Sequence, residues 1–363
     1  MDTLPLLALL TTAARPEPEA RSLATPAHPE PEAWSLDGAP LYPPAFSGLA
    51  HEALDAQLSI AQDALRTPPV ADPAKHVWLG RRLAYKWLYR EALAAYSSAV
   101  DDFPHDAPLR RHRGHRLVTT RNFSRAEADL AEAERLINGT ADGWEPDGEP
   151  NSLNLPLSSR HFNVRYHLGL ARYLQADWAG ALMAYGAMAS HGPFANDESV
   201  AATAHWRYMA LRRSGHAADS AEVNATLAPI HPGMRALDGG AYLQLCLLYK
   251  GLRAPPDLSN ASALDLATLG YGVANWHFYG GRTSEAVALW RRVLNTSYWA
   301  AFGFIAAEAE LTGSERGSWW RLEKDASGKN SPLFSHARLL FLFLRARFKG
   351  GVRSTLRRPC HHS

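Results

Sequence analysis

Two histidines and the arginines around them form the part of this 363-residue chain in which residue types and spacing could do chemistry. His112 and His115 are three positions apart in the run Arg110-Arg-His-Arg-Gly-His-Arg116, so in a helix both imidazoles point to one side. Guanidinium groups bind carboxylates through paired hydrogen bonds. Imidazole changes its charge near neutral pH, which suits it to general acid–base catalysis. The run therefore predicts either a site for an acidic ligand or an acid–base centre.

A 34-residue period indicates the elements that would position these side chains. Small residues recur where two helices must touch closely, and large apolar residues recur where they interlock. The pattern predicts helix–turn–helix units over about 73–106 and 107–140, and it resumes after an interruption at 141–161 with Leu168, Gly169, Trp178, Ala181 and Tyr185. The recurring residues are Leu79, Gly80, Leu83, Tyr89, Ala92, Tyr96, Ala99 and Pro104, then Arg113, Gly114, Leu117, Phe123, Ala126, Leu130, Ala133 and Asn138.

The chain from about residue 75 to 311 resembles the tetratricopeptide repeat (TPR), a helix–turn–helix unit of this length. It is similar in particular to poorly characterised, often exported bacterial members of that family. The resemblance implies an all-α fold, an α-solenoid in which TPR-type repeats stack into a right-handed superhelix with a concave face. It also implies a scaffold that binds other proteins through this groove. The segments that carry it are His76-Val-Trp-Leu-Gly-Arg-Arg82, Arg111-His-Arg-Gly-His-Arg116 and Tyr166-His-Leu-Gly-Leu-Ala171.

Equivalent positions on the first helix of each unit place aromatic and basic side chains toward the concave groove. Trp78, His112 and His167 occupy one such position. We therefore predict a groove that binds a protein or an acidic peptide, with binding that weakens in salt and as the histidines lose protons between about pH 6 and 7.5. The predicted contact residues are Arg81, Arg111, His112, His115, Tyr166, His167, His205 and Trp206.

Other interpretations of the same residues stay open. The basic run is also typical of a solvated helix face. The groove histidines would alternatively serve a hydrolase or isomerase as general acid and base. His112, His115 and His167 could in principle share a metal ion, but the neighbouring arginines would repel a cation. We expect no metal, no cofactor and no catalytic residues.

Composition and motifs favour a binding protein over an enzyme. The chain has no phosphate-binding loop, no Gly-x-Ser-x-Gly elbow and no His-Glu-x-x-His motif. Its 38 basic and 36 acidic residues nearly balance, so its net charge does not indicate nucleic acid. It has no run of about 18 apolar residues, so we expect no membrane span. Cys246 lies in an apolar run and is predicted to be a buried small residue.

The N-terminus has features of an exported protein. Residues 1–14 contain the apolar run Leu4-Pro-Leu-Leu-Ala-Leu-Leu10 before Thr12-Ala13-Ala14, which is typical of a signal peptide. Asn-X-Ser/Thr acceptors for glycosylation exceed the roughly one or two that chance would give. Secretion or export is the prediction, with a cytoplasmic location as the alternative. The acceptors are Asn122, Asn138, Asn224, Asn260 and Asn295.

Composition and periodicity predict the structure of the regions outside the clear repeats. Residues 15–48 are rich in Pro and Glu and predict an extended or disordered spacer. The helical array is expected over 49–312, with 141–161 as a loop over one face. Helices are expected at 49–65, 199–228 (two helices), 237–252, 263–279, 283–295 and 298–311. Residues 313–363 predict a capping helix near 334–348 and a basic tail.

Overall fold

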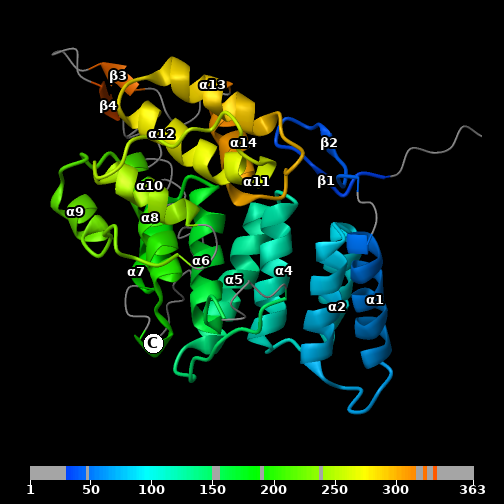
Figure 1. The fold of residues 1–363 in the computed structure, drawn as a ribbon. Coiled ribbons are helices and arrows are strands. Elements are labelled where there is room, and N and C mark those ends of the chain that lie inside the picture. Colours follow the sequence, from blue (N-terminus) through cyan, green and yellow to red (C-terminus); the bar gives the residue numbers. More distant parts are fainter. Residues whose placement is uncertain are drawn as a thin grey trace, which may run out of the picture. The chain divides into compact units, whose positions relative to one another are not determined.

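The computed structural model describes residues 30–45, 49–148, 156–188, 192–236, 240–315, 322–324 and 330–332. In these ranges the chain is mostly helical (Figure 1). The all-α class and the stacking of paired helices are confirmed. The predicted signal peptide, most of the spacer and the predicted capping helix lie outside the described residues.

The first helices fall where the 34-residue period predicts them. Each pair packs on the next along the chain. Aspartates begin two of the helices: the Asp72 side chain accepts a hydrogen bond from Ala74 N, and that of Asp106 accepts from Leu109 N, which satisfies N–H groups that have no partner inside the helix. The helices are α1 (Leu49–Ala64), α2 (Pro73–Tyr85), α3 (Tyr89–Asp102), α4 (Ala107–Thr119) and α5 (Phe123–Ile137).

The later helices also pack in pairs, and several of them are shorter than the earlier ones. The predicted helix over 263–279 is one continuous run that contains a π-helical turn, Leu266–Gly270. The helix predicted over 298–311 begins at Phe302 rather than Tyr298. These helices are α6 (Arg160–Tyr173), α7 (Trp178–Gly186), α8 (Asp197–Arg213), α9 (Ala221–Leu227), α10 (Ala241–Tyr249), α11 (Ala263–Asp265), α12 (Tyr271–Tyr279), α13 (Thr283–Leu294) and α14 (Phe302–Glu315).

The period corresponds to specific contacts between the two helices of a pair. A Cβ added to Gly80 would lie 2.2 Å from Tyr96 Cζ, and one added to Gly114 would lie 2.6 Å from Leu130 Cγ. At Gly169 the same atom would lie 2.3 Å from Tyr185 Cε1. The glycines therefore let the second helix of each pair press its large side chain against the backbone of the first.

The turns inside the repeats share one backbone conformation. Trp87, Arg121 and Ala176 have φ values of 61°, 64° and 60°, a left-handed region that ordinary residues rarely adopt. Gly215 and Gly281 stand in the corresponding turns of later pairs, at 91° and 75°. The left-handed backbone conformation of this turn position is therefore constant, although the residue type at the position varies.

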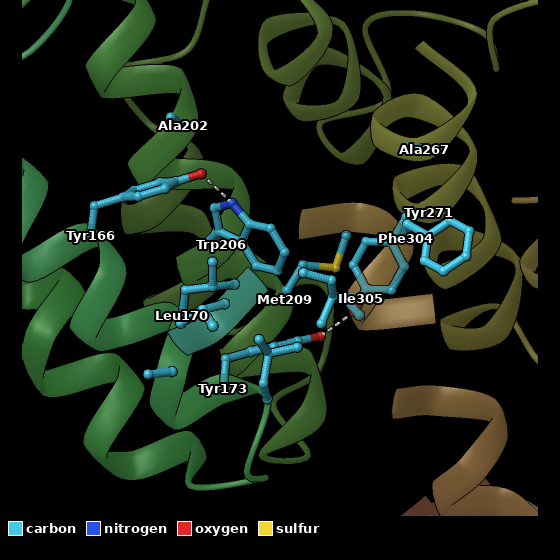
Figure 2. Close-up of a cluster of buried hydrophobic side chains, with 14 of the residues drawn as sticks. Tyr166, Leu170, Tyr173, Ala202, Trp206, Met209, Ala267, Tyr271, Phe304 and Ile305 are labelled. Carbon is cyan, nitrogen blue, oxygen red and sulfur yellow. Dashed lines mark hydrogen bonds between the residues drawn. The ribbon is translucent and has the colours of Figure 1, made fainter. Parts of the chain in front are cut away.

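The core is continuous across the stacked pairs. In Figure 2, Trp206 of α8 lies between Tyr166 of α6 and Met209, with Phe304 and Ile305 of α14 beyond. Trp206 Nε1 donates to Tyr166 Oη at 2.8 Å. Two residues predicted to contact a ligand, Tyr166 and Trp206, are therefore core residues, 7% and 1% exposed.

The spacer prediction is wrong for residues 33–41, which form a hairpin of β1 (Ala33–Trp34) and β2 (Pro40–Leu41). Ala33 is buried, and the Glu32 carboxylate accepts from Arg90 N at 2.9 Å. Pro40 lies in β2 and does not prevent this, because the ladder is only two residues long on each side. A second short hairpin joins β3 (Leu322–Lys324) and β4 (Asn330–Pro332).

Helix α14 and the residues before it contact the β1–β2 hairpin region and the α4–α5 turn. The Arg121 guanidinium, from the α4–α5 turn, donates to Glu308 Oε2 at 2.8 Å, and the backbone N–H of Leu36 donates to the other carboxylate oxygen. Trp299 Nε1 donates to Tyr42 O at 2.7 Å. Trp87 and Arg121, the equivalent turn residues of two repeats, both pack against the Trp299 ring.

Candidate functional site

Most of the predicted groove residues are buried, and only some of them lie in contact with one another. Arg111 is 7% exposed, His112 6%, His167 4% and His205 1%. Arg81 and His115 are half-buried. The open surface that the repeat register implied is therefore covered by other parts of the same chain.

One cover is the start of α14. The ring centroids of His115 and His167 lie 4.3 Å apart, and the Phe302 ring lies 5.2 Å from the first and 5.6 Å from the second. His167 Nδ1 donates to Asn163 O at 2.6 Å, which fixes its tautomer. The two imidazoles converge as an acid–base pair would, but a phenyl ring takes the place that a substrate would need.

His205 lies in an aromatic environment on α8. Its ring centroid is 4.8 Å from that of Tyr242 and 5.1 Å from that of Trp206. Its Nδ1 is 3.2 Å from Tyr249 Oη. His205 is therefore a polar core residue rather than a groove residue.

The second cover is the insert segment, which we define as residues 144–148. Glu145 Oε1 lies 3.2 Å from Arg111 NH1 and 3.5 Å from His112 Nε2. Its other oxygen accepts from Asn163 Nδ2 at 3.0 Å. The carboxylate is thus held by α4 on one side and α6 on the other, with the Glu145 side chain 12% exposed.

Two arginines of α2 hold the main chain of the insert segment. Arg81 NH1 donates to Pro146 O at 2.7 Å, and Arg82 NH1 donates to Gly148 O at 2.9 Å. Both guanidinium groups also lie over the Trp78 ring, with Cζ at 4.6 Å and 5.0 Å from its centroid. We call Arg81, Arg82, Arg111 and His112 the basic face.

The protonation state of His112 follows from its neighbours. Arg111 NH1 lies 2.9 Å from His112 Nδ1, and because arginine only donates, Nδ1 must accept and the proton must sit on Nε2, toward Glu145. Burial lowers the pKa of His112 well below its ordinary value, and the Arg111 charge lowers it further.

The other predicted groove histidines also have lowered pKa values. Burial lowers the pKa of His115 and of His167 well below the ordinary value, with Arg116 and Arg111 respectively adding to the effect. Burial alone lowers the pKa of His205 to about 3. The expectation that these side chains lose protons between pH 6 and 7.5 is therefore wrong, because they are already neutral there.

Within the described ranges, no group of three or more His, Cys, Asp or Glu side chains is arranged to hold a metal ion. Across the same ranges, no helix has the length and apolar character needed to cross a bilayer. Cys246 is buried and unpaired, and burial raises the pKa of its thiol.

Sequence reasoning missed three features of this region. Glu145 lies in the non-repetitive insert, and Phe302 begins a helix far along the chain, so no period pointed to either. The third is an open depression of about 490 Å³ beside the β1–β2 hairpin. Trp34 is 57% exposed at its wall, and it lies in the stretch that the composition predicted to be a spacer. The lining residues are Trp34, Ser35, Leu36, Thr120, Arg121, Asn122, Phe123, Ser124 and Gln175.

Comparisons with known proteins return structural likenesses alone. No protein-family model and no curated protein matches the sequence. The crystal structure of YrrB, described as a TPR protein with an unusual peptide-binding site, is 12% identical, with a TM-score of 0.35 over 70% of this chain and 99% of that one. A TPR protein from Parabacteroides merdae ATCC 43184 is 14% identical, with a TM-score of 0.40 over 73% and 94%. At these values the helical-repeat architecture rests on the chain's own helix pairs, which the Gly80, Gly114 and Gly169 contacts define.

Proposed function

We propose that this protein is a helical-repeat scaffold whose basic face binds an acidic segment of a protein partner. One observation carries the proposal: the basic face holds a non-helical segment of the chain itself. Glu145 supplies a carboxylate to Arg111, and the carbonyls of Pro146 and Gly148 accept from Arg81 and Arg82. Carboxylate and main-chain recognition together are what peptide binding requires.

The mode of binding differs from the predicted one. Tyr166, His205 and Trp206 are buried in the core and are not part of the proposed binding surface. Because the buried histidines are neutral near pH 7, the positive charge of the face comes from its arginines. Binding should therefore weaken with salt but change little between pH 6 and 7.5.

The enzyme alternative gains no specific support. His115 and His167 are adjacent, but Phe302 packs against both rings. A general acid or base must come within hydrogen-bond reach of its substrate.

Cross-linking mass spectrometry tests the proposal. The wild type and an Arg81→Gln/Arg82→Gln variant are mixed with host extract, cross-linked, and the partner segments mapped. Segments enriched in Asp and Glu should attach near α2 in the wild type and be lost in the variant. Arg125→Gln/Arg291→Gln makes the same change at exposed positions and should retain them. A set of cross-linked segments that is the same in all three proteins would refute the proposal.

A further inference from the structure

The open depression beside the β1–β2 hairpin lies against the turns of two successive repeats. Leu36 lines it from the hairpin, Asn122 from the α4–α5 turn and Gln175 from the α6–α7 turn. Its volume of about 490 Å³ is in the range of small-ligand sites. The hairpin wall is held in place, because the backbone N–H of Leu36 donates to the buried Glu308 carboxylate. The depression is therefore a preformed feature of the fold.

The depression has no charge left for a ligand. Arg121 is the only charged residue among the described residues that line it. Its Nε and NH2 donate to Glu308 Oε2 at 3.0 Å and 2.8 Å, and both side chains are buried. This ion pair neutralises the guanidinium, whereas the basic face carries more arginines than carboxylates. The ligand that suits the depression is therefore uncharged.

Most main-chain donors of the depression are also occupied. The lining residues whose backbone N–H already donates to another residue of the chain are Ser35, Leu36, Thr120, Arg121, Asn122 and Gln175. A protein that binds an extended peptide as an added strand needs a row of free main-chain groups. The depression therefore does not suit a peptide backbone.

Side-chain groups of the depression can still bond to a ligand. Asn122 is exposed, and its side chain makes no capping hydrogen bond to α5. Ser124 Oγ donates to Gln175 Oε1 at 3.0 Å, so the same hydroxyl oxygen can accept a hydrogen bond from a ligand. An amide both donates and accepts. These groups therefore match a ligand rich in hydroxyl groups, which also donate and accept.

Trp34 adds a large aromatic surface to the depression. Side chains alternate along a strand, so Ala33 is buried and Trp34 is 57% exposed. The indole face is apolar, and its edge carries one N–H donor. A sugar ring is uncharged, presents C–H groups on its faces and carries hydroxyl groups around its edge. It therefore meets all the requirements that the lining residues set.

We propose that this depression binds a neutral saccharide, with the sugar ring packed on Trp34 and its hydroxyl groups bonded to Asn122 and Ser124. The site shares no residue with the basic face, and it does not depend on the acidic partner proposed above. The same chemistry has two sources. The saccharide belongs to another molecule, or it is the glycan predicted on Asn122, which would begin at the edge of the depression.

Ligand-observed NMR titration tests the proposal on the full chain made in bacterial cytoplasm, where it carries no N-glycan. The probes are maltose, cellobiose, lactose and N,N′-diacetylchitobiose. At least one should bind, and added salt should not weaken its binding, because no free charge takes part. Trp34→Ala should weaken binding about tenfold, and Asn122→Ala should weaken it as well. Trp144→Ala is the matched control and should bind as wild type does, because this indole is 40% exposed but does not line the depression.

Protein from the native host distinguishes the two sources. If the depression holds the Asn122 glycan, enzymatic deglycosylation of the folded protein should release it more slowly than the glycan on exposed Asn138. Trp34→Ala should then remove the difference. Equal release rates, or an unmodified Asn122, assign the saccharide to another molecule.

Three results would overturn the proposal. The first is that the wild type binds no disaccharide of the panel. The second is equal affinity of wild type and Trp34→Ala at equal helicity by circular dichroism. The third is an acetylated tetra-alanine peptide that binds more tightly than every sugar, because the depression would then suit a neutral peptide.

Discussion

We predict that His205 makes the stability of this protein sensitive to acid. Its side chain is 1% exposed among aromatic rings, and burial lowers its pKa to about 3, against about 6.5 for an unfolded histidine. As pH falls below 6.5, the unfolded chain takes up a proton at this position and the folded chain does not. Stability is therefore complete above the unfolded pKa and is lost as pH falls.

The magnitude follows from the two pKa values. One pH unit corresponds to about 1.4 kcal/mol per differentially bound proton. Between pH 7.5 and pH 5, His205 should therefore remove about 2 kcal/mol from the free energy of unfolding. Because pH 5 lies well above the pKa of the folded state, this figure depends mainly on the unfolded value.

The substitution His205→Gln isolates the effect. Glutamine does not titrate and can still bond to Tyr249 Oη, which lies 3.2 Å from His205 Nδ1. Urea unfolding at pH 7.5, 6 and 5 gives the free energies. The variant should be less stable at pH 7.5 but should lose about 2 kcal/mol less than wild type on going to pH 5. His231→Gln, at an exposed position, should follow wild type. Parallel pH dependences of wild type and His205→Gln would refute the reasoning.

Three further predictions concern packing, the buried ion pair and modification. Gly114→Ala should cost about 1–3 kcal/mol in thermal or urea unfolding, because its Cβ would meet the Leu130 side chain at 2.6 Å; an unchanged melt would contradict the helix contact. Glu308→Gln should cost about 3–5 kcal/mol, because it leaves the Arg121 guanidinium buried without its counter-charge (side chains 4% and 5% exposed), whereas Glu132→Gln on the surface should leave the urea midpoint near that of wild type. All five sequon asparagines are exposed at or near helix ends, so protein from the native host should lose mass on enzymatic deglycosylation, and an intact mass equal to that of the bare chain would contradict the glycoprotein prediction.

Contacts within the period could be predicted from the sequence. Gly114 and Leu130 belong to one repeat, and their counterparts Gly80 and Tyr96 occupy the same positions 34 residues earlier. When a contact recurs in successive repeats, similar residue types recur at its two positions. Two segments of the sequence therefore record the same contact. The approach of His115 to His167 was predictable for a different reason, because the register places both on the side of a first helix that faces the predicted groove.

Contacts that occur only once could not be predicted in this way. Glu145 comes from an insert without a counterpart in other repeats, and Phe302 is far from His115 in sequence. No periodic signal marks either, although together they turn a predicted open groove into a covered one. The arginines in the sequence predicted the charge of the basic face. They could not predict that the face is covered, because the covering segments lie outside the 34-residue period.

The contact between Trp299 and the start of the chain has a consequence for folding. In an open repeat array each unit touches only its neighbours, so the ends fray independently and folding can start anywhere. Here one hydrogen bond joins Trp299 to Tyr42 across 257 positions, and the Arg121–Glu308 pair spans 187. Such pairings form late, because the chain between them must be ordered first. The β1–β2 hairpin and α14 should therefore melt in one cooperative transition, and a ribosome must release the chain through α14 before the hairpin can form these contacts.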